Sequence, residues 1–216
     1  YLEDDADGTN SGKAYIYNVT TGTLVHTLDN PNPFGTSTDN YFGKEVAISG
    51  DHAIVGADGE DEAGGPSSGK AYIYNVSTGG LVHTLDNPSA YGTSGGDNFG
   101  KSVSISGTHA IVGAYLEDDA GDTNSGNMAG KAYIYNVSTG ALVHTLDNPN
   151  AYDTSAGDQF GGSVGISGDH AIVSAYNEDD AGGTTSGKAY IYNVTTGALV
   201  HTLDNPNPFG SSDGDY

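Results

Sequence analysis

The chain has 216 residues, no cysteine, and a net charge of −22 from 28 acidic residues and six lysines. An anionic surface of this kind would repel a phosphate backbone or an anionic bilayer, which argues against nucleic acid as a partner. No stretch approaches the ~20 apolar residues that span a membrane, so we expect no membrane insertion. The 34 glycines and 15 tyrosines, with many other turn formers, predict an all-β fold.

A twenty-residue phrase occurs four times along the chain. It begins with Gly-Lys-Ala-Tyr-Ile-Tyr-Asn, ends at a proline, and is identical at 18 positions in all four copies, which start at Gly12, Gly69, Gly130 and Gly187. Near-identical modules present the same surface four times, whereas a catalytic site needs different groups that converge on one point. The repeat therefore predicts a structural architecture and argues against an enzyme.

Each full repeat is predicted to hold four short strands. The first runs over 42–49 from a Phe-Gly pair, and the second, over 52–57, is apolar on both faces, as in a strand buried between two sheets. After an acidic glycine-rich loop, the third strand over 71–75 places its tyrosines on one face. The fourth, over 81–85, ends before a proline that cannot donate to a ladder.

Four antiparallel strands in about 57 residues, repeated, predict β-propeller-type blades that must stack to bury their two apolar faces. The chain supplies fourteen such strands, because the first two strands occur only three times. We therefore predict an array that is incomplete at both ends, with a missing hairpin supplied by further repeats of the chain or by another copy. The predicted units are 1–41 (third and fourth strands only), 42–98, 99–159 with a four-residue insertion, and 160–216.

The residues that follow each Phe-Gly pair carry a family resemblance. The segment 99–107, Phe-Gly-Lys-Ser-Val-Ser-Ile-Ser-Gly, followed by Ala-Ile-Val-Gly-Ala-Tyr over 110–115, resembles the FG-GAP repeat over nearly the whole chain. The surrounding Ala-Tyr-Ile-Tyr and His-Thr-Leu phrases are similar to the bacterial form of that repeat. The resemblance implies integrin-α-like β-propeller blades and an extracellular or cell-surface role in adhesion or scaffolding. The integrin calcium loop is not implied, since only Ser-Gly-Asp-His or its equivalent stands between the first two strands.

Acidic residues cluster instead between the second and third strands of each repeat. Clustered carboxylates on a loop suit calcium, which takes six to eight oxygen ligands, although a run of acids is also typical of a solvated loop. The candidate calcium ligands are Glu3, Asp4, Asp5, Asp7, Asn10, Asp58, Glu60, Asp61, Glu117, Asp118, Asp119, Asp122, Glu178, Asp179 and Asp180. Calcium is the one cofactor that the sequence suggests.

One Asn-Val-Ser/Thr sequon occurs at the same place in every repeat. Glycans at these positions would decorate each blade identically, whereas the alternative is that Asn, Thr and Gly simply form a hairpin turn. The candidate glycosylation sites are Asn18, Asn75, Asn136 and Asn193.

The histidines and tyrosines recur at whole-repeat spacing, so neither set offers ligands at short spacing. We predict hydrogen-bonded histidines and tyrosines packed between blades, with a sugar-binding platform as the lesser alternative. The chain has no Gly-x-Ser-x-Gly elbow and no phosphate-binding loop that opens a helix, and we expect no catalysis.

Two functions of different classes remain. The first is an extracellular structural or adhesive repeat protein, a unit of a surface fibre or array that associates with copies of itself or further repeats. The second is part of a closed FG-GAP propeller that binds a protein or carbohydrate ligand in cell adhesion. Near-identity of the repeats favours the first, and the insertion around 127–129 is the best candidate for a ligand-specific loop.

Overall fold

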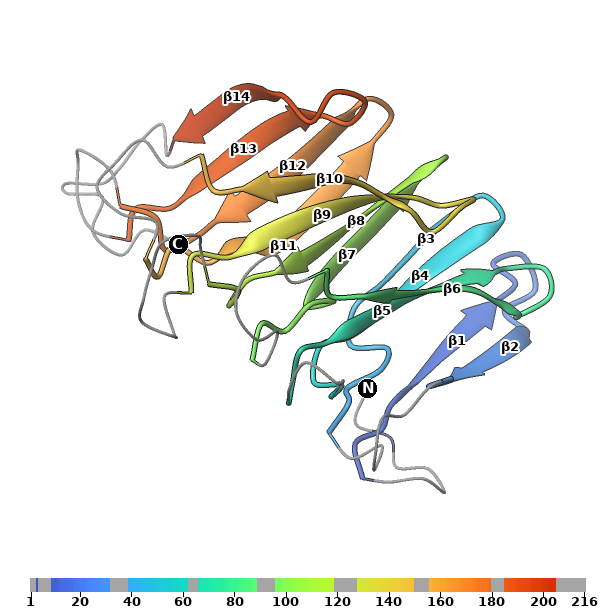
Figure 1. Ribbon diagram of the computed structural model, residues 1–216. Helices are drawn as coiled ribbons and strands as arrows, with labels where there is room; N and C mark the ends of the chain where they lie inside the picture. Colours follow the sequence, from blue (N-terminus) through green and yellow to red (C-terminus); the bar gives the residue numbers. More distant parts are fainter. Residues whose placement is uncertain are drawn as a thin grey trace.

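The computed structural model describes residue 3 and residues 9–31, 39–61, 66–88, 96–118, 128–149, 156–179 and 185–204. These residues form fourteen strands and no helix, which confirms the predicted all-β class. The strands make four antiparallel sheets (Figure 1). The sheets are β1 (Lys13–Tyr17) and β2 (Leu24–Asp29); β3 (Val46–Ser49), β4 (His52–Ala57), β5 (Lys70–Asn75) and β6 (Leu81–Asp86); β7 (Ser102–Ser106), β8 (His109–Ala114), β9 (Lys131–Asn136) and β10 (Leu142–Asp147); and β11 (Phe160–Ser167), β12 (His170–Ala175), β13 (Lys188–Asn193) and β14 (Leu199–Asp204).

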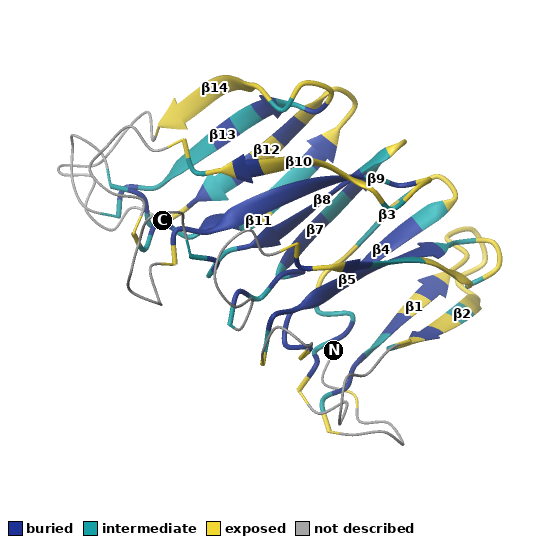
Figure 2. Cartoon of the chain, viewed as in Figure 1, coloured by how far each residue is buried: buried dark blue, intermediate teal, exposed yellow. Residues whose placement is uncertain are grey.

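The sheets stack as an open row of propeller-like blades, from β1 and β2 at one end to β14 at the other (Figure 1). The first strands of successive sheets, β3, β7 and β11, lie against one another. Burial is greatest in the second and third strands of the two middle sheets, β4, β5, β8 and β9, whereas the fourth strands are largely exposed in every sheet and β14 is exposed throughout (Figure 2). Within the described ranges no sheet closes on itself.

The first strand of the inner repeats begins later than the sequence predicts. We expected it to start at Phe42, but β3 starts at Val46. Gly43 has a φ of +83°, a left-handed conformation that interrupts the extended chain. Phe42 instead forms a parallel bridge with Gly12 of the preceding repeat. In the first two full repeats the Phe-Gly pair therefore joins neighbouring blades and opens no strand, whereas in the last repeat β11 begins at Phe160, as predicted.

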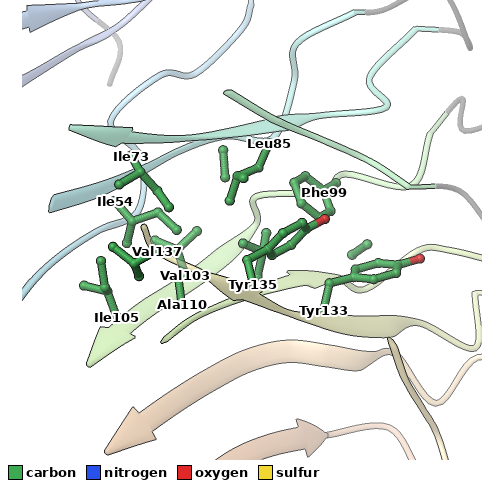
Figure 3. Close-up of a cluster of buried hydrophobic side chains, with 13 residues drawn as sticks. Ile54, Ile73, Leu85, Phe99, Val103, Ile105, Ala110, Tyr133, Tyr135 and Val137 are labelled. Atoms are coloured by element: carbon green, nitrogen blue, oxygen red, sulfur yellow. The ribbon is translucent and has the colours of Figure 1, made fainter. Parts of the chain in front are cut away.

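Successive side chains of the third strand point to opposite faces of its sheet. They therefore pack into two different seams, where a seam is the interface between two neighbouring sheets. Tyr72 and Tyr74 pack toward the preceding sheet, whereas Ala71 and Ile73 pack toward the following one, as the period-2 pattern predicts. Figure 3 shows the seam between the second and third sheets, where Ile54, Ile73 and Leu85 meet Phe99, Val103, Ile105, Tyr133 and Tyr135. Each seam is thus formed by the back face of one blade, which is the face toward the following sheet, and the front face of the next blade, which is the face toward the preceding sheet.

The described residues contain no helix long and apolar enough to cross a bilayer.

Three of the six lysines form ion pairs within a sheet. The lysine that opens the third strand lies opposite the aspartate that ends the fourth, and the two side chains form ion pairs, Lys13–Asp29, Lys70–Asp86 and Lys131–Asp147. Cross-strand pairs of opposite charge favour this register.

Candidate functional site

A glutamate lies three residues after the end of the second strand, in a turn where its backbone N–H donates to the carbonyl oxygen of the strand's last residue. In the three complete sheets this glutamate is fully buried, at Glu60, Glu117 and Glu178. Its neighbour is the first tyrosine of the third strand, whose hydroxyl donates to the carboxylate. The Tyr72 hydroxyl lies 2.7 Å from Glu60 Oε2, and the Tyr133 hydroxyl lies 2.6 Å from Glu117 Oε1.

Burial changes the acidity of these groups. Removal from water raises the pKa of the Glu60 and Glu117 carboxyls to about 7, against the opposing effect of the tyrosine hydrogen bonds. Burial, followed by the charge of Glu178, raises the pKa of Asp158 to about 7 as well. The seams therefore hold carboxyl groups that titrate near neutral pH.

Glu178 and Glu3 show two variants of the same arrangement. Glu178 accepts hydrogen bonds from Tyr190 and from Lys188, whose Nζ lies 3.0 Å from Glu178 Oε1. Glu3 precedes the two-stranded sheet and is exposed, and the Tyr15 hydroxyl is 2.5 Å from its Oε2. The glutamate–tyrosine pair thus recurs in all four repeats, whereas its burial and its other hydrogen-bond partners differ.

Asp58 departs from the repeat and links two blades. It occupies the place of Tyr115 and Tyr176, and its side chain is almost fully buried. Lys44 Nζ lies 2.8 Å from Asp58 Oδ2, and Lys101 Nζ, from the following repeat, lies 3.9 Å from the same oxygen. Two ammonium groups already neutralise this carboxylate, which makes it a poor ligand for a further cation.

Three other candidate ligands close their own loops. Asp61, Asp118 and Asp179 each accept a backbone N–H from the residue two before the next repeat phrase, at 2.8, 3.2 and 2.7 Å. Asn10 donates its side-chain amide to Asp39. Within the described ranges no three acidic or histidine side chains gather as a metal site. The remaining candidates, Asp4, Asp5, Asp7, Asp119, Asp122 and Asp180, lie outside the described residues, and calcium binding stays a prediction.

The sequon asparagines form the turn between the third and fourth strands. Asn75 Oδ1 accepts the backbone N–H groups of Ser77 and Thr78, at 3.1 and 2.9 Å. The same two bonds recur at the other three sequons, Asn18, Asn136 and Asn193. The Asx turn is by itself a sufficient reason for an asparagine at this position in every repeat, whether or not a glycan is attached. Glycosylation at the four positions stays a prediction.

Two glycines of each seam allow the backbones of neighbouring blades to touch. A Cβ on Gly12, Gly69 or Gly130 would lie 2.0–2.1 Å from the carbonyl oxygen of the phenylalanine in the following blade. The glycine after that phenylalanine is equally crowded, since a Cβ on Gly100 would lie 2.2 Å from the Lys70 carbonyl oxygen. Only glycine fits such approaches. The two sequence markers, Gly-Lys and Phe-Gly, are thus the two sides of one backbone contact.

The histidines of the fourth strand form hydrogen bonds across two of the three seams, whereas His83 Nε2, in the seam between the second and third sheets, is buried without a hydrogen-bond partner among the described residues. His26 Nε2 donates to the Ser77 carbonyl oxygen at 3.1 Å, and His144 Nε2 donates to the Thr195 carbonyl oxygen at the same distance. In both cases the acceptor lies in the sequon turn of the following blade. This agrees with the predicted structural role of these residues.

The aromatic rings fill the seams, as predicted. The Phe99 ring centroid lies 5.7 Å from that of Tyr133 and 6.1 Å from that of Tyr135, the second pair nearly perpendicular. The same geometry is found around Phe42 and Phe160. Such edge-to-face clusters favour packing over display to a ligand.

The sequence pattern did not reveal the buried role of Glu60, Glu117 and Glu178. Each begins a run of acids, which indicates a solvated loop, and only its fixed distance from the third-strand tyrosine could have marked it. The glycine contact was also missed, although four glycines at repeat spacing before a strand are a signal for close backbone approach.

The two ends of the row expose positions that the inner seams bury. Leu203 is 42% exposed, whereas its counterparts Leu28, Leu85 and Leu146 are at most 3% exposed. At the other end Tyr17 is 55% exposed and its counterparts are at most 4% exposed. The exposed face of the last sheet differs from the equivalent inner faces at one polar position. Ser174 stands where the inner sheets have Gly56 and Gly113, and its hydroxyl donates to the Ser163 carbonyl oxygen. A partner on that face has to accommodate this side chain.

Four-stranded antiparallel sheets that stack face to face through repeated seams define a β-propeller-type repeat protein. The FG-GAP repeat model matches residues 35–74, 89–135 and 150–192, more than half of the chain. The chain belongs to the FG-GAP repeat family. Among solved structures it is similar to the computationally designed Ika4 protein, with 13% identity over 79% of this chain and 75% of that chain and a TM-score of 0.46. None of the curated proteins matches the sequence.

Proposed function

We propose that this chain is a structural and adhesive segment of an extracellular fibre or surface array, in which FG-GAP blades stack on further repeats or on copies of the chain. The observation that carries the proposal is the exposure, at both ends of the row, of apolar positions that are buried in every inner seam. Contiguous exposed apolar surface at such positions favours association.

The two exposed ends are complementary halves of one kind of seam. The last sheet presents a back face with Ile172 and Leu203, and the two-stranded sheet presents part of a front face with Tyr15, Tyr17 and Val19. A contact between different surfaces is heterologous, so it builds a ring if the rotation closes and a filament if it does not. The stacking geometry of the inner blades is the template for that contact.

The alternative proposal is a closed FG-GAP propeller that binds a protein or carbohydrate ligand in adhesion. The identity of 18 of 20 positions in four copies supports the structural role, because a specific site requires loops that differ. Met128 is exposed and lies in the described part of the loop that carries the four-residue insertion. The rest of that loop, 119–127, lies outside the described residues.

The chemistry of the surface supports an extracellular setting. A net charge of −22 favours solubility and attracts divalent cations, and calcium on the acidic loops would lower the repulsion between stacked blades. Glycans on the four sequon turns would lie on the outer side of every blade. Both belong to the proposal as features to be measured.

The test compares one pair of leucine variants by electron microscopy and sedimentation velocity. Leu203→Asp places a charge on the exposed end face, whereas Leu199→Asp is the matched control. Leu199 is 43% exposed, and its counterparts are exposed in every repeat, so it lies on no seam. We expect chains of copies for the wild type and for Leu199→Asp, and a loss of chains for Leu203→Asp.

A mixing experiment identifies the contact as heterologous. Tyr17→Asp disables the opposite end, so Tyr17→Asp and Leu203→Asp should each remain single, while their equimolar mixture retains one intact end of each kind and forms 1:1 dimers. Discrete rings of fixed size in the wild type would overturn the fibre in favour of the closed propeller. Equal loss of assembly in Leu199→Asp would show a general effect of charge and would also overturn the proposal.

A further inference from the structure

A groove of about 500 Å³ lies between the two-stranded sheet and the second blade. Its walls are β1 on one side and the β3–β4 hairpin on the other, and its lining is mainly apolar, with Ile16, Leu28, Val46 and Ile48 among the residues. Val46 is 57% exposed and Ile48 is 61% exposed. No other seam of the described chain leaves these positions open.

The equivalent positions of the next blade show what covers them. Val103 and Ile105 are buried, and they pack in one cluster with Ile54 of β4 and Ile73 of β5. Ile16 is the counterpart of Ile73 and is present in the groove. The counterpart of Ile54 would come from a strand paired with β1, and among the described strands β1 pairs with β2 alone. The groove is therefore the space of one hairpin.

We infer that the groove binds a β-hairpin of this repeat's own type, the first two strands of an FG-GAP repeat, added to the free edge of β1. The inference rests on the proposed stacking function, because it names the segment that completes the terminal blade of the row. Strand addition to an open sheet edge is a general mode of peptide recognition, with backbone hydrogen bonds for affinity and side-chain pockets for specificity.

The inner blades set the register of the added strand. In the third blade Ile111 lies opposite Ile134, Val112 opposite Tyr133, and Gly113 opposite Ala132. Transferred to β1, the corresponding isoleucine, valine and glycine of the hairpin lie opposite Ile16, Tyr15 and Ala14. The phenylalanine that starts the hairpin then lies against the rings of Tyr15 and Tyr17, as Phe99 lies against Tyr133 and Tyr135.

One position of the hairpin decides which sequences fit. A Cβ on Gly56 would lie 2.1 Å from the Gly100 carbonyl oxygen, and a Cβ on Gly113 would lie 2.0 Å from the Gly161 carbonyl oxygen. The hairpin in the groove meets Gly43 in the same way and needs glycine there. The chain's last hairpin, 160–175, has Ser174 at this position and is therefore disfavoured as the occupant.

The probe is a synthetic peptide with the sequence of residues 99–114, added to the full chain. Hydrogen exchange is measured along β1, and the rings of Tyr15 and Tyr17 are followed by NMR. We expect a 1:1 complex, about tenfold slower exchange of the β1 amides that do not face β2, and shifted resonances of both rings. Peptides with Gly113→Ser or Ile111→Asp are the matched controls, and each should bind at least about tenfold more weakly.

A fusion covers the case in which the peptide is insoluble. The segment 99–114 is joined in front of Tyr1, since Ala114 precedes Tyr-Leu-Glu at 115–117 as the graft would precede Tyr-Leu-Glu at 1–3. The graft should raise Tm and slow exchange in β1, and the same graft with Gly113→Ser should do neither. Unchanged exchange in β1 with both peptide and graft, or equal effects of the control sequences, would overturn the inference.

The outcomes separate this inference from the proposed function. If the peptide protects β1 while the wild type forms no chains, the result would support the hairpin site in the groove and contradict the proposed fibre. If chains form while neither peptide nor graft protects β1, the result would support the proposed fibre and contradict the hairpin site.

Discussion

The two-stranded sheet β1–β2 and the third blade β7–β10 contain nearly the same twenty-residue phrase in two different environments. Tyr15 is 42% exposed, whereas Tyr133, at the same place in the phrase, is fully buried. The local structure is unchanged, because the strand pairing, the Asx turn and the glutamate–tyrosine bond recur in both. The phrase therefore specifies a hairpin by itself, and its burial comes entirely from neighbouring strands and blades.

This difference shows where the stability of the array resides. A repeat module gains most of its apolar burial from contacts with adjacent modules, so its stability is the sum of weak intrinsic terms and strong interface terms. Identical substitutions at inner and terminal copies should then have unequal effects. Three of the following experiments compare such a pair, and one compares a buried glutamate with an exposed one.

The largest difference is expected at the seam glycines. Gly69 and Gly187 both have a left-handed φ, +81° and +72°, but a Cβ on Gly69 would collide with the Phe99 carbonyl oxygen, whereas on Gly187 the nearest atom lies 3.1 Å away. Gly187→Ala should cost about 1–2 kcal/mol for the backbone conformation alone. Gly69→Ala adds a backbone collision and should cost about 4 kcal/mol. Urea unfolding measures both, and equal losses would contradict a close contact between blades.

A somewhat smaller difference is expected for the isoleucine of the second strand. Ile111 is fully buried between two blades, and Ile172, its counterpart in the last blade, is 42% exposed. Ile111→Ala should lower the free energy of unfolding by about 3 kcal/mol, through lost burial and the cavity left behind. Ile172→Ala should lower it by less than about 1 kcal/mol. The comparison is made at low protein concentration, because association would bury Ile172 and bring the two values together.

Much of the fold could be predicted from the sequence because its signals are local and repeated. The strand β4, His52–Ala57, coincides with its predicted range, and the alternation of Tyr72 and Ile73 predicts which seam each faces. The start of β3 could not be predicted, since the left-handed Gly43 and the bridge from Phe42 depend on the preceding blade. The burial of Glu60 could not be predicted from the sequence for the same reason. Its burial is a property of the stacked array, while its sequence neighbours are those of a solvated loop.

Two of the buried glutamates, Glu60 and Glu117, predict that the stability of the protein depends on pH. Burial raises the pKa of Glu60 and Glu117 to about 7 from the ordinary 4.5. A raised pKa in the folded state stabilises the protein below the unfolded pKa, and that stabilisation is lost as the pH rises through about 7. Unfolding in urea should therefore show greater stability at pH 6 than at pH 8. Glu117→Gln should remove about 1 kcal/mol of this gain.

The control for that measurement is Glu45→Gln, which removes the same charge from an exposed position. It relieves general repulsion in a chain with a net charge of −22 but leaves the buried groups in place. An equal change in pH dependence for the two variants would assign the effect to net charge and not to burial.

The smallest difference is expected at the histidines of the fourth strand. His144 donates to the Thr195 carbonyl oxygen of the following blade, and its ring lies beneath Gly197, where a Cβ would be 2.8 Å from His144 Nδ1. His201 holds the same position in β14, beyond which the described chain has no further blade. His144→Ala should lower the free energy of unfolding by about 1 kcal/mol, the net value of one hydrogen bond, and His201→Ala should leave it nearly unchanged. If chains of copies form, His201 gains a turn to bind, so its variant should then lower the stability of the assembled form and not that of the single chain. A His201→Ala effect in the single chain would show that the outer strand is stabilised within its own sheet, and the contrast between inner and terminal blades would not extend to this edge.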